Sequence, residues 1–197
     1  MAFYLDDILA EPFVIEPPDT IDLDEYTGAT ATVVDPVGVS SDCTATLEDG
    51  TVEVTLPAEP LTVEGIHRVR VTLTGTGTRR LPDVRFVVQD ADSPWHTLDS
   101  IRDEWADADA IDDGTLWELL QITRDQVLEF APTLAEGVPV PDHYRYGQRL
   151  HSRNTWNASK VNTDGGLGDG DFVLRPFPLD WHVKQILRPK RGIPVFG

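Results

Sequence analysis

Apolar and polar residues alternate at a period of two in residues 51–56 and 67–73, and further short apolar runs occur within the first 92 residues. Alternation of this kind buries one face of a β-strand and leaves the other face in solvent. Turn formers such as residues 48–50 separate the runs, at the spacing of a small antiparallel sandwich. We therefore expect an antiparallel β-sandwich of about six strands. The clearest runs are residues 13–15, 30–34, 51–56, 67–73 and 84–88.

From Trp95 onward the apolar residues recur at three and four positions, which is the period of an α-helix. Thr97 can cap a first helix, on which Leu98, Ile101 and Trp105 share one face. Trp95 and Trp105 are therefore expected in the core of a helical domain.

Two longer helices are expected next. The first begins at a cap on Thr115 and ends before Pro132, because proline disfavours a helical conformation in the residue before it. The second covers residues 142–160 and places Tyr146 and Leu150 together on one face.

The rest of the chain is predicted to hold one short helix, a loop and a tail. A helix is expected over residues 179–187, ended by Pro189. Residues 164–171 are too rich in glycine for regular structure and are expected to form a contact loop. The fold class is thus α+β in two domains with an extended tail: residues 1–92 as an immunoglobulin-like β-sandwich, 93–187 as a small helical bundle, and 188–197 as the tail.

Charge is unevenly distributed along the 197 residues. The chain has 34 acidic and 16 basic residues, a formal charge of −18. By segment the net charges are −13 for residues 1–92, −9 for 93–138 and +4 for 139–197. This balance disfavours non-specific attraction to nucleic acid or to an anionic membrane. The basic rear and the acidic front are therefore expected to face different neighbours.

Other classes of protein are disfavoured by features of the sequence. Cys43 is the single cysteine, so an internal disulfide and a thiolate zinc cluster are both excluded, and a small buried hydrophobe is its expected role. The N-terminus lacks the basic and apolar pattern of a signal peptide, so no export is expected. The longest uncharged stretch, residues 26–34, is too short to span a membrane.

No motif indicates catalysis. No G-x-S-x-G sequence occurs, and the five histidines are scattered. His143 and His151 are two helical turns apart, about 12 Å, which is too far for a shared metal without further ligands. The acidic run of residues 107–114 suggests calcium, but Ile111 occupies a position where an EF-hand needs an oxygen ligand. A solvated capping loop is favoured, and no cofactor or metal is expected.

Arg145, Arg149 and Arg153 form a row at four-residue intervals along the third helix. Such a row can contact either nucleic-acid phosphates or an acidic protein surface. The charge of −18 favours the protein surface. Trp156 is either a core anchor or an interface residue. The glycine-rich loop lacks the G-K-[ST] ending of a phosphate cradle, and its three aspartates would repel phosphate.

The second half carries four motifs of a known family: WHTLDSIRDEW (95–105), LWELL (116–120), RLHSRNTWNA (149–158) and PLDWHVKQILRPKRGIPVFG (178–197). With these motifs it resembles the head-to-tail adaptor (connector) proteins of long-tailed bacteriophages, especially those infecting actinobacteria. The resemblance implies a helical bundle that forms a twelve-membered ring beneath the portal. It also implies a C-terminal tail that docks on the portal.

The resemblance assigns residues to two surfaces. The portal-binding residues would be Arg188, Pro189, Lys190, Arg191, Gly192, Ile193, Pro194, Val195, Phe196 and Gly197. The resemblance also makes the loop around residues 165–171 a channel or neighbour contact. With the arginine row and Trp156, which are singled out above from the residues themselves, the expected subunit or channel contacts are Arg145, Arg149, Arg153, Trp156, Gly165, Gly166, Leu167, Gly168 and Asp169. The implied partners are the portal protein, neighbouring adaptor subunits, the next neck (head-closure) or tail protein, and genomic DNA that passes without sequence-specific binding. The implied location is the neck of the virion, after synthesis in the host cytoplasm.

The first half carries a second resemblance, on the motifs DTIDL (19–23), TGAT (27–30), LTVEGIHRVR (61–70) and FVV (86–88). It is similar to the immunoglobulin-like N-terminal domain of phage baseplate upper proteins. Such a domain could decorate the neck, brace adjacent adaptors or contact the capsid.

The sequence thus predicts a structural virion protein without catalysis, which assembles as a dodecameric ring between portal and tail. One alternative is a carbohydrate-binding or baseplate attachment module, in which the sandwich recognises a host glycan. Another is a metal-dependent hydrolase, which would need carboxylates and histidines to converge in space.

Overall fold

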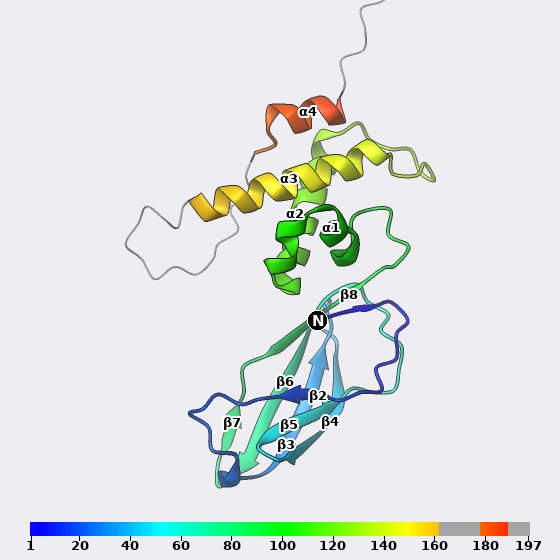
Figure 1. The fold of residues 1–197 in the computed structure, drawn as a ribbon. Coiled ribbons are helices and arrows are strands. Elements are labelled where there is room, and N and C mark those ends of the chain that lie inside the picture. The colour runs from blue at the N-terminus through cyan, green and yellow to red at the C-terminus, as the bar shows by residue number, and fades with distance from the viewer. Residues whose placement is uncertain (162–177, 189–197) are drawn as a thin grey trace, which may run out of the picture. The chain divides into compact units, whose positions relative to one another are not determined.

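The computed structural model describes residues 1–161 and 178–188, with the main chain alone at Val161. The chain divides between Ala91 and Asp92 into two compact units, called here the sheet unit and the helical unit (Figure 1). Every strand of the described residues lies in the sheet unit, and every α-helix lies in the helical unit. The predicted α+β class is confirmed.

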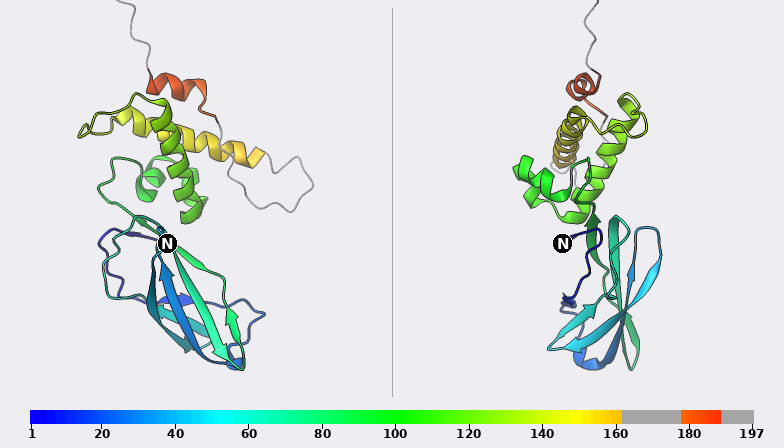
Figure 2. Two further views of the ribbon diagram at one scale, coloured as in Figure 1. Left: turned by 180° about the vertical axis from the view of Figure 1, so that it is seen from behind. Right: turned by 90° about the vertical axis from the view of Figure 1, so that its right-hand side faces the viewer.

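The sheet unit is a curled, mixed sheet of eight strands (Figures 1 and 2). The strand order is β1-β8-β6-β3-β4-β5-β2, and β7 pairs with β6 outside this path. The β1–β8 pair is parallel and all other pairs are antiparallel. The bounds are β1 Ala2–Tyr4, β2 Phe13–Ile15, β3 Tyr26–Val34, β4 Ser40–Glu48, β5 Thr51–Thr55, β6 Gly65–Gly75, β7 Thr78–Arg80 and β8 Val84–Gln89, with a 3-10 turn at Leu23–Glu25.

The five predicted strands are confirmed as β2, β3, β5, β6 and β8. In β6 the alternation is complete, since Val69, Val71 and Leu73 are buried and the residues between them are not. β1, β4 and β7 were not predicted. β1 and β7 have only three residues each, and β4 turns Cys43, Ala45 and Leu47 toward the core, each of them only partly buried. Cys43 is one of these; it is only half-buried, and this partial burial raises the pKa of its thiol.

The sheet curls because β4 pairs with different neighbours along its length. Residues 40–43 pair with β3, and residues 44–48 pair with β5. This brings β2, at one end of the strand order, back over β8 near the other end. The rings of Phe13 in β2 and Phe86 in β8 have centroids 5.3 Å apart, and Phe3 of β1 lies 6.0 Å from Phe13. A single hydrophobic core therefore fills the inside of the curl.

The turn between β4 and β5 was predicted from residues 48–50 and is confirmed. Asp49 has φ of 45° and Gly50 has φ of 82°. A two-residue hairpin turn with both central φ values positive matches the twist of the strands that it joins, and Asp-Gly is a favoured pair for it.

The helical unit contains four α-helices and a 3-10 segment among its described residues. Thr97 caps α1 as predicted, and its side chain and that of Ser100 form a reciprocal capping box. α2 ends at Phe130, with Ala131 as its C-cap before Pro132, also as predicted. The bounds are α1 Leu98–Glu104, the 3-10 segment Ala106–Ala110, α2 Asp113–Phe130, α3 Asp142–Val161 and α4 Trp181–Leu187.

Two predicted helix starts are wrong by two or three residues. α2 is capped by Asp112, whose carboxylate accepts the Thr115 N–H at 2.9 Å, so Thr115 lies inside the first turn. α4 is capped by Asp180, which accepts the Val183 N–H at 2.8 Å, so Leu179 precedes the helix. In both cases the side chain of an aspartate accepts a main-chain N–H of the first turn and so sets where the helix starts.

The core of the helical unit contains Trp95 and Trp105, as predicted. Trp95 packs with Val127, Val183 and Leu187 from α2 and α4. The predicted apolar face of α3 is wrong at Tyr146, which is 40% exposed. α3 instead buries a mostly polar set: Tyr144, Gln148, His151, Ser152 and Thr155.

None of the helices within residues 1–161 and 178–188 combines the length and the apolar content that crossing a bilayer requires.

Replacing Phe86 with alanine should lower the free energy of unfolding of the sheet unit by about 3 to 5 kcal/mol, since a buried ring is lost and a cavity remains. Amide hydrogen exchange of β6 and β8 measures this directly. Val37→Ala is the matched control, because Val37 is 74% exposed and its truncation removes no core contact. Equal protection in the two variants would contradict the role given to the Phe86 ring.

Candidate functional site

A seam of buried polar side chains joins α2 and α3 in the helical unit. Gln148 of α3 donates from Nε2 to the Leu120 carbonyl of α2 at 3.0 Å. Its Oε1 accepts the main-chain N–H of His96, before α1, at 3.1 Å. One fully buried amide therefore joins three segments. The hydroxyls of Thr123 and Ser152 lie 2.8 Å apart and complete the seam. Because these partners are specific, the seam fixes how α3 lies on α2.

His96 is the most perturbed histidine of the seam. Its side chain is buried, and burial lowers its pKa, helped by the positive charge of Arg145, to about 4. Nδ1 lies 3.2 Å from the Ser100 hydroxyl and 3.4 Å from Nε of Arg145, which donates to it. The imidazole is therefore neutral at physiological pH and accepts at Nδ1.

The pairing of Ser100 with His96 resembles the contact between a nucleophile and its base, but the surroundings favour a structural role. The Ser100 hydroxyl accepts the Thr97 N–H at 2.9 Å as part of the α1 capping box. An imidazole with a pKa of about 4 is a weak base near neutral pH. The pair therefore completes a helix start and locks the residues before α1.

His151 is buried in α3, and its Nε2 contacts the side-chain oxygen of Gln126 on α2. Burial lowers its pKa. His143, the other histidine weighed in the sequence for a metal pair, is exposed and packs edge-on to Tyr144. In the part of the chain that the structure describes, no three His, Cys, Asp or Glu side chains come together in a way that could hold a metal ion.

The acidic run of residues 107–114 has structural partners. Asp112 caps α2, as given above. Burial alone would raise its pKa, but hydrogen bonds from Thr115 and neighbouring main-chain groups outweigh this and lower it. Asp113 pairs with Arg102 of α1 at 2.7 Å, and Arg102 also donates to the Ile111 carbonyl at 3.1 Å. These contacts hold α1 and the start of α2 together.

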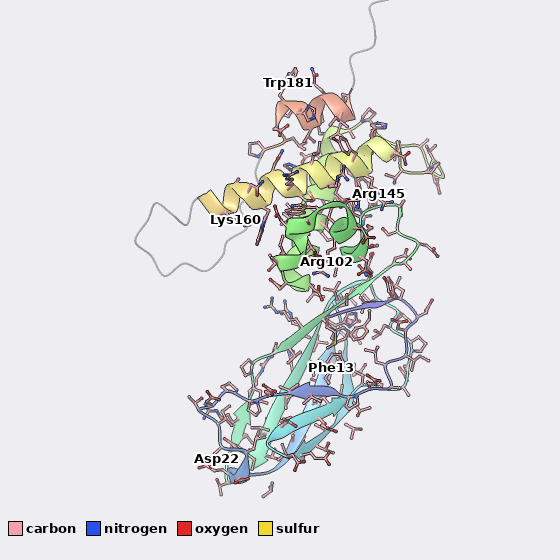
Figure 3. The ribbon with its side chains drawn as sticks, in the orientation of Figure 1. Phe13, Asp22, Arg102, Arg145, Lys160 and Trp181 are labelled. Atoms are coloured by element: carbon pink, nitrogen blue, oxygen red, sulfur yellow. The ribbon has the colours of Figure 1, made fainter. Side chains whose placement is uncertain are left out.

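The three arginines of the predicted row lie in different surroundings (Figure 3 labels Arg145). Arg145 donates to His96, as described above. Arg149 pairs with Glu104 of α1, and its guanidinium lies 4.9 Å from the centre of the Tyr146 ring. Arg153 is exposed. The acidic partner of Arg149 therefore belongs to its own chain, and Arg153 is the member of the row with the most solvent around it.

Trp156 is half-buried on α3, and the ammonium group of Lys160 lies 5.1 Å from the centre of its ring. This contact is a cation–π interaction between residues four apart on one helix. The tryptophan thus covers part of the α3 surface near Lys160, the end of the helix labelled in Figure 3.

α4 joins the helical core through one face and presents a tryptophan on another. Val183 and Leu187 are buried, and the Asp180 carboxylate accepts a hydrogen bond from Asn154 of α3. Trp181 is 71% exposed (Figure 3). An exposed tryptophan offers a large, rigid apolar area, which is typical of residues that dominate protein interfaces.

Arg188 is the first residue of the predicted portal-binding tail and the only one of the ten that the structure describes. Its N–H donates to the Lys184 carbonyl at 3.0 Å, and its guanidinium lies 4.7 Å from the centre of the Phe130 ring of α2. Arg188 therefore anchors the end of α4 to its own chain. The remaining nine tail residues, 189–197, and the predicted loop contacts at 165–169 lie outside the described residues.

No protein-family model matches the chain, and no curated protein sequence matches it. Among solved structures, the chain is similar to the crystal structure of the Lin-41 filamin domain, with 15% sequence identity and a TM-score of 0.28. The match covers 44% of this chain and 81% of that chain.

The sequence reasoning missed three residues of this site: His96, Gln148 and Trp181. His96 and Gln148 belong to polar stretches of the sequence. Their hydrogen bond joins residues 52 positions apart, and no sequence pattern indicates such a contact. Trp181 had a signal, since it directly follows the capping residue Asp180 and two of the core positions, Val183 and Leu187, lie on another face of the helix.

Gln148→Leu should lower the free energy of unfolding of the helical unit by about 2 to 3 kcal/mol. The leucine is more apolar, but the His96 N–H loses its partner in a buried place. The Leu120 carbonyl loses one donor and keeps the Thr123 hydroxyl at 3.2 Å. Urea unfolding followed by tryptophan fluorescence measures the effect, because all five tryptophans lie at or after Trp95. A variant as stable as the wild type would show that water or a neighbour satisfies the His96 N–H.

The helical unit should lose stability as the pH falls from about 6.5 toward 4. In this window the unfolded chain binds a proton at residue 96 that the folded chain does not bind, so folding becomes less favourable. Between pH 7 and pH 5 the contribution of His96 is about 2 kcal/mol. His151 acts in the same direction.

His96→Gln isolates this contribution, since glutamine is polar and does not titrate. Urea midpoints of the wild type and the variant, each at pH 7 and pH 5, give the comparison. The variant should lose less stability than the wild type between the two pH values. An equal loss would assign the pH dependence to other groups.

Proposed function

We propose that the protein is a structural component of a bacteriophage neck, an adaptor that assembles as a dodecameric ring beneath the portal and joins the head to the tail. The observation that carries the proposal is the arrangement of α4. This helix is fixed to the core on one side, exposes Trp181 on another, and ends where a basic, apolar-tipped tail sequence begins.

α4 is anchored to the core, so the residue with which the tail sequence begins, Arg188, is held in place. Val183 and Leu187 pack with Trp95 and Val127, and Arg188 lies on Phe130. Arg188 is therefore held at a defined position at the end of α4, and residues 189–197 follow it in the chain. Their sequence, PKRGIPVFG, combines two basic residues with Ile193, Val195 and Phe196. Apolar residues that flank a proline suit addition as a strand to a partner sheet, and the basic pair suits an acidic portal surface.

The surface of α3 supports contacts between neighbouring subunits. Arg153 and Tyr146 are exposed on it, and Trp156 is half-buried. A ring repeats each contact around its circumference, so weak contacts of single subunits suffice for a stable assembly.

In this proposal the sheet unit is an immunoglobulin-like sandwich on the adaptor. Its support is the curl at β4, which places β2 and β5 over β6 and β8 around one core. Two packed faces around one core are the arrangement of a sandwich. The unit would decorate the neck or brace adjacent adaptors.

The mechanism is geometric and includes no catalytic step. The ring extends the DNA channel of the portal and presents a lower surface to the next neck or tail protein. The formal charge of −18 suits this role, because a lining that attracted phosphates would slow the passage of DNA.

Co-sedimentation with purified cognate portal rings, followed by electron microscopy of the pellet, tests the proposal. Full-length protein should add a ring beneath the portal. A chain that ends at Arg188 should bind at least about tenfold more weakly, because the tail is gone while α4 and its anchor remain. Val37→Ala, an exposed change in the sheet unit, should bind as the wild type does.

If the truncated chain binds as well as the full chain, the docking surface lies in the helices and the tail assignment is wrong. If the full chain does not bind portal rings, the adaptor function is wrong. Binding to a host glycan array would then test the alternative of a carbohydrate-binding or baseplate attachment module.

A further inference from the structure

The charged residues of the sheet unit are sorted by strand. Its five basic residues other than histidine are all arginines, and all lie in β6, β7 and β8, which contain no acidic residue. β4 and β5 contain three acidic residues and no lysine or arginine. We call β6–β8 the positive half and β4–β5 the negative half. The residues are Arg68, Arg70, Arg79, Arg80 and Arg85 in the first and Asp42, Glu48 and Glu53 in the second.

Apart from Arg79, which is aligned with the core residue Leu73, these charged side chains lie on the outer side of the curled sheet. Val69 and Val71 face the core, so Arg68 and Arg70 face outward. Across the ladder, Arg70 is opposite Thr32 of β3, and Thr32 is opposite Asp42 of β4. Arg70 and Asp42 thus share a face but lie two strands apart, about 10 Å, which is too far for an ion pair.

Two arginines of the positive half occupy directly opposed positions on neighbouring strands. Arg68 and Arg85 are direct partners across the β6–β8 ladder, and both are exposed. Like charges in directly opposed positions destabilise a sheet. Asp83 forms ion pairs with two other arginines: its Oδ2 lies 3.6 Å from Nε of Arg70, and its Oδ1 lies 2.8 Å from Nη2 of Arg80. Within the described chain, neither Arg68 nor Arg85 has a hydrogen bond or ion pair to a carboxylate.

A small hollow lies within the positive half and is suited to a carboxylate. It measures about 160 Å³ and is lined by threonines of β3 and β6 together with Arg70 and Arg80. Arg70 and Arg80 already pair with Asp83, but each guanidinium has five N–H donors, so further donors can reach an acidic side chain in the hollow.

We propose that the positive half of one sheet unit binds the negative half of the sheet unit of a second copy of this chain. The second copy carries the complementary surface, since Asp42 and Glu48 are exposed on its negative half and Glu53 lies between them on β5. Carboxylates from that copy reach Arg68, Arg85 and the hollow, and they relieve the repulsion between the paired arginines.

Nucleic acid fits the positive half less well than a second copy does. The outward positions of β3 and β6 hold glycine, threonine, valine, isoleucine and arginine, so no aromatic ring is available there for stacking on bases.

The two surfaces of this contact differ, so it joins successive copies head to tail. Repetition of a head-to-tail contact closes a ring when the rotation between copies allows it. The contact extends the proposed neck ring to the sheet units, but it does not depend on portal binding, and it can be measured without a portal.

Sedimentation velocity of the full-length chain at low salt tests the inference. The wild type should self-associate. Arg68→Glu/Arg85→Glu should raise the apparent dissociation constant by about tenfold or more, and Asp42→Lys/Glu53→Lys should do the same. An equimolar mixture of the two variants should associate again, because each then offers the charge that the other lacks.

Two controls separate this effect from general changes in charge. Arg68→Lys/Arg85→Lys keeps the positive charge and should associate nearly as the wild type does. Glu59→Lys/Glu64→Lys makes the same charge change as the acidic variant at exposed loop positions, and it should leave the dissociation constant unchanged. In about 1 M salt, where the screening length is about 3 Å, the wild type and the variants should converge.

A wild type that stays monomeric at low salt overturns the inference, and so does a mixture of variants that fails to associate. A labelled DNA duplex, bound by the wild type and not by Arg68→Glu/Arg85→Glu, would assign the positive half to nucleic acid instead. Portal co-sedimentation of the same variants keeps the two proposals apart, because binding to the portal is expected to be unchanged.

Discussion

The aromatic contact between Phe13 and Phe86 decides the shape of the sheet unit. The two rings come from strands near opposite ends of the strand order, with centroids 5.3 Å apart. An open sheet with this order would leave one of its faces without a partner. The curl at β4 lets that face bury itself, and Phe3 and the stacked ring of His67 complete the packing around Phe86. The curl also determines where the positive half and the negative half lie on the outer surface of the sheet unit.

Different kinds of interaction stabilise the interior of each unit. The sheet unit depends on an apolar core whose members come from seven strands and their loops. The helical unit has an apolar core as well, but α3 contributes to it chiefly through amides, hydroxyls and a histidine. Apolar packing tolerates small shifts between elements, whereas a hydrogen-bonded seam requires one register. The helical unit is therefore suited to holding α4 and the start of the tail in one position.

Elements with a regular apolar period were predictable from the sequence, and elements fixed by distant partners were not. β5 and β6 alternate cleanly, and α1 has both a cap and a three-four stripe. β1 becomes a strand only because β8 lies beside it, and β7 only because β6 does. The buried face of α3 was misjudged at Tyr146 because its true members are polar, and no hydropathy pattern marks a polar residue whose partners lie on another helix. Arg145, Arg149, Arg153 and Trp156 lie on α3 as expected, but their role as subunit contacts stays a prediction. Gln148 and His96 were found only through their contacts.

The pairing of β1 with β8 has a consequence for the order in which the chain folds. Ala2 is aligned with Val87, so the first strand of the sequence cannot find its place until nearly the whole unit has been synthesised. Contacts between such distant residues require the closure of a long loop, which slows folding and raises the contact order. During synthesis β1 has no partner strand until β8 has been made, so Phe3 stays exposed. The apolar side chains of the N-terminal segment can then associate with other molecules. The ribosome-bound chain, rather than the finished protein, is the state in which this unit is most vulnerable to aggregation.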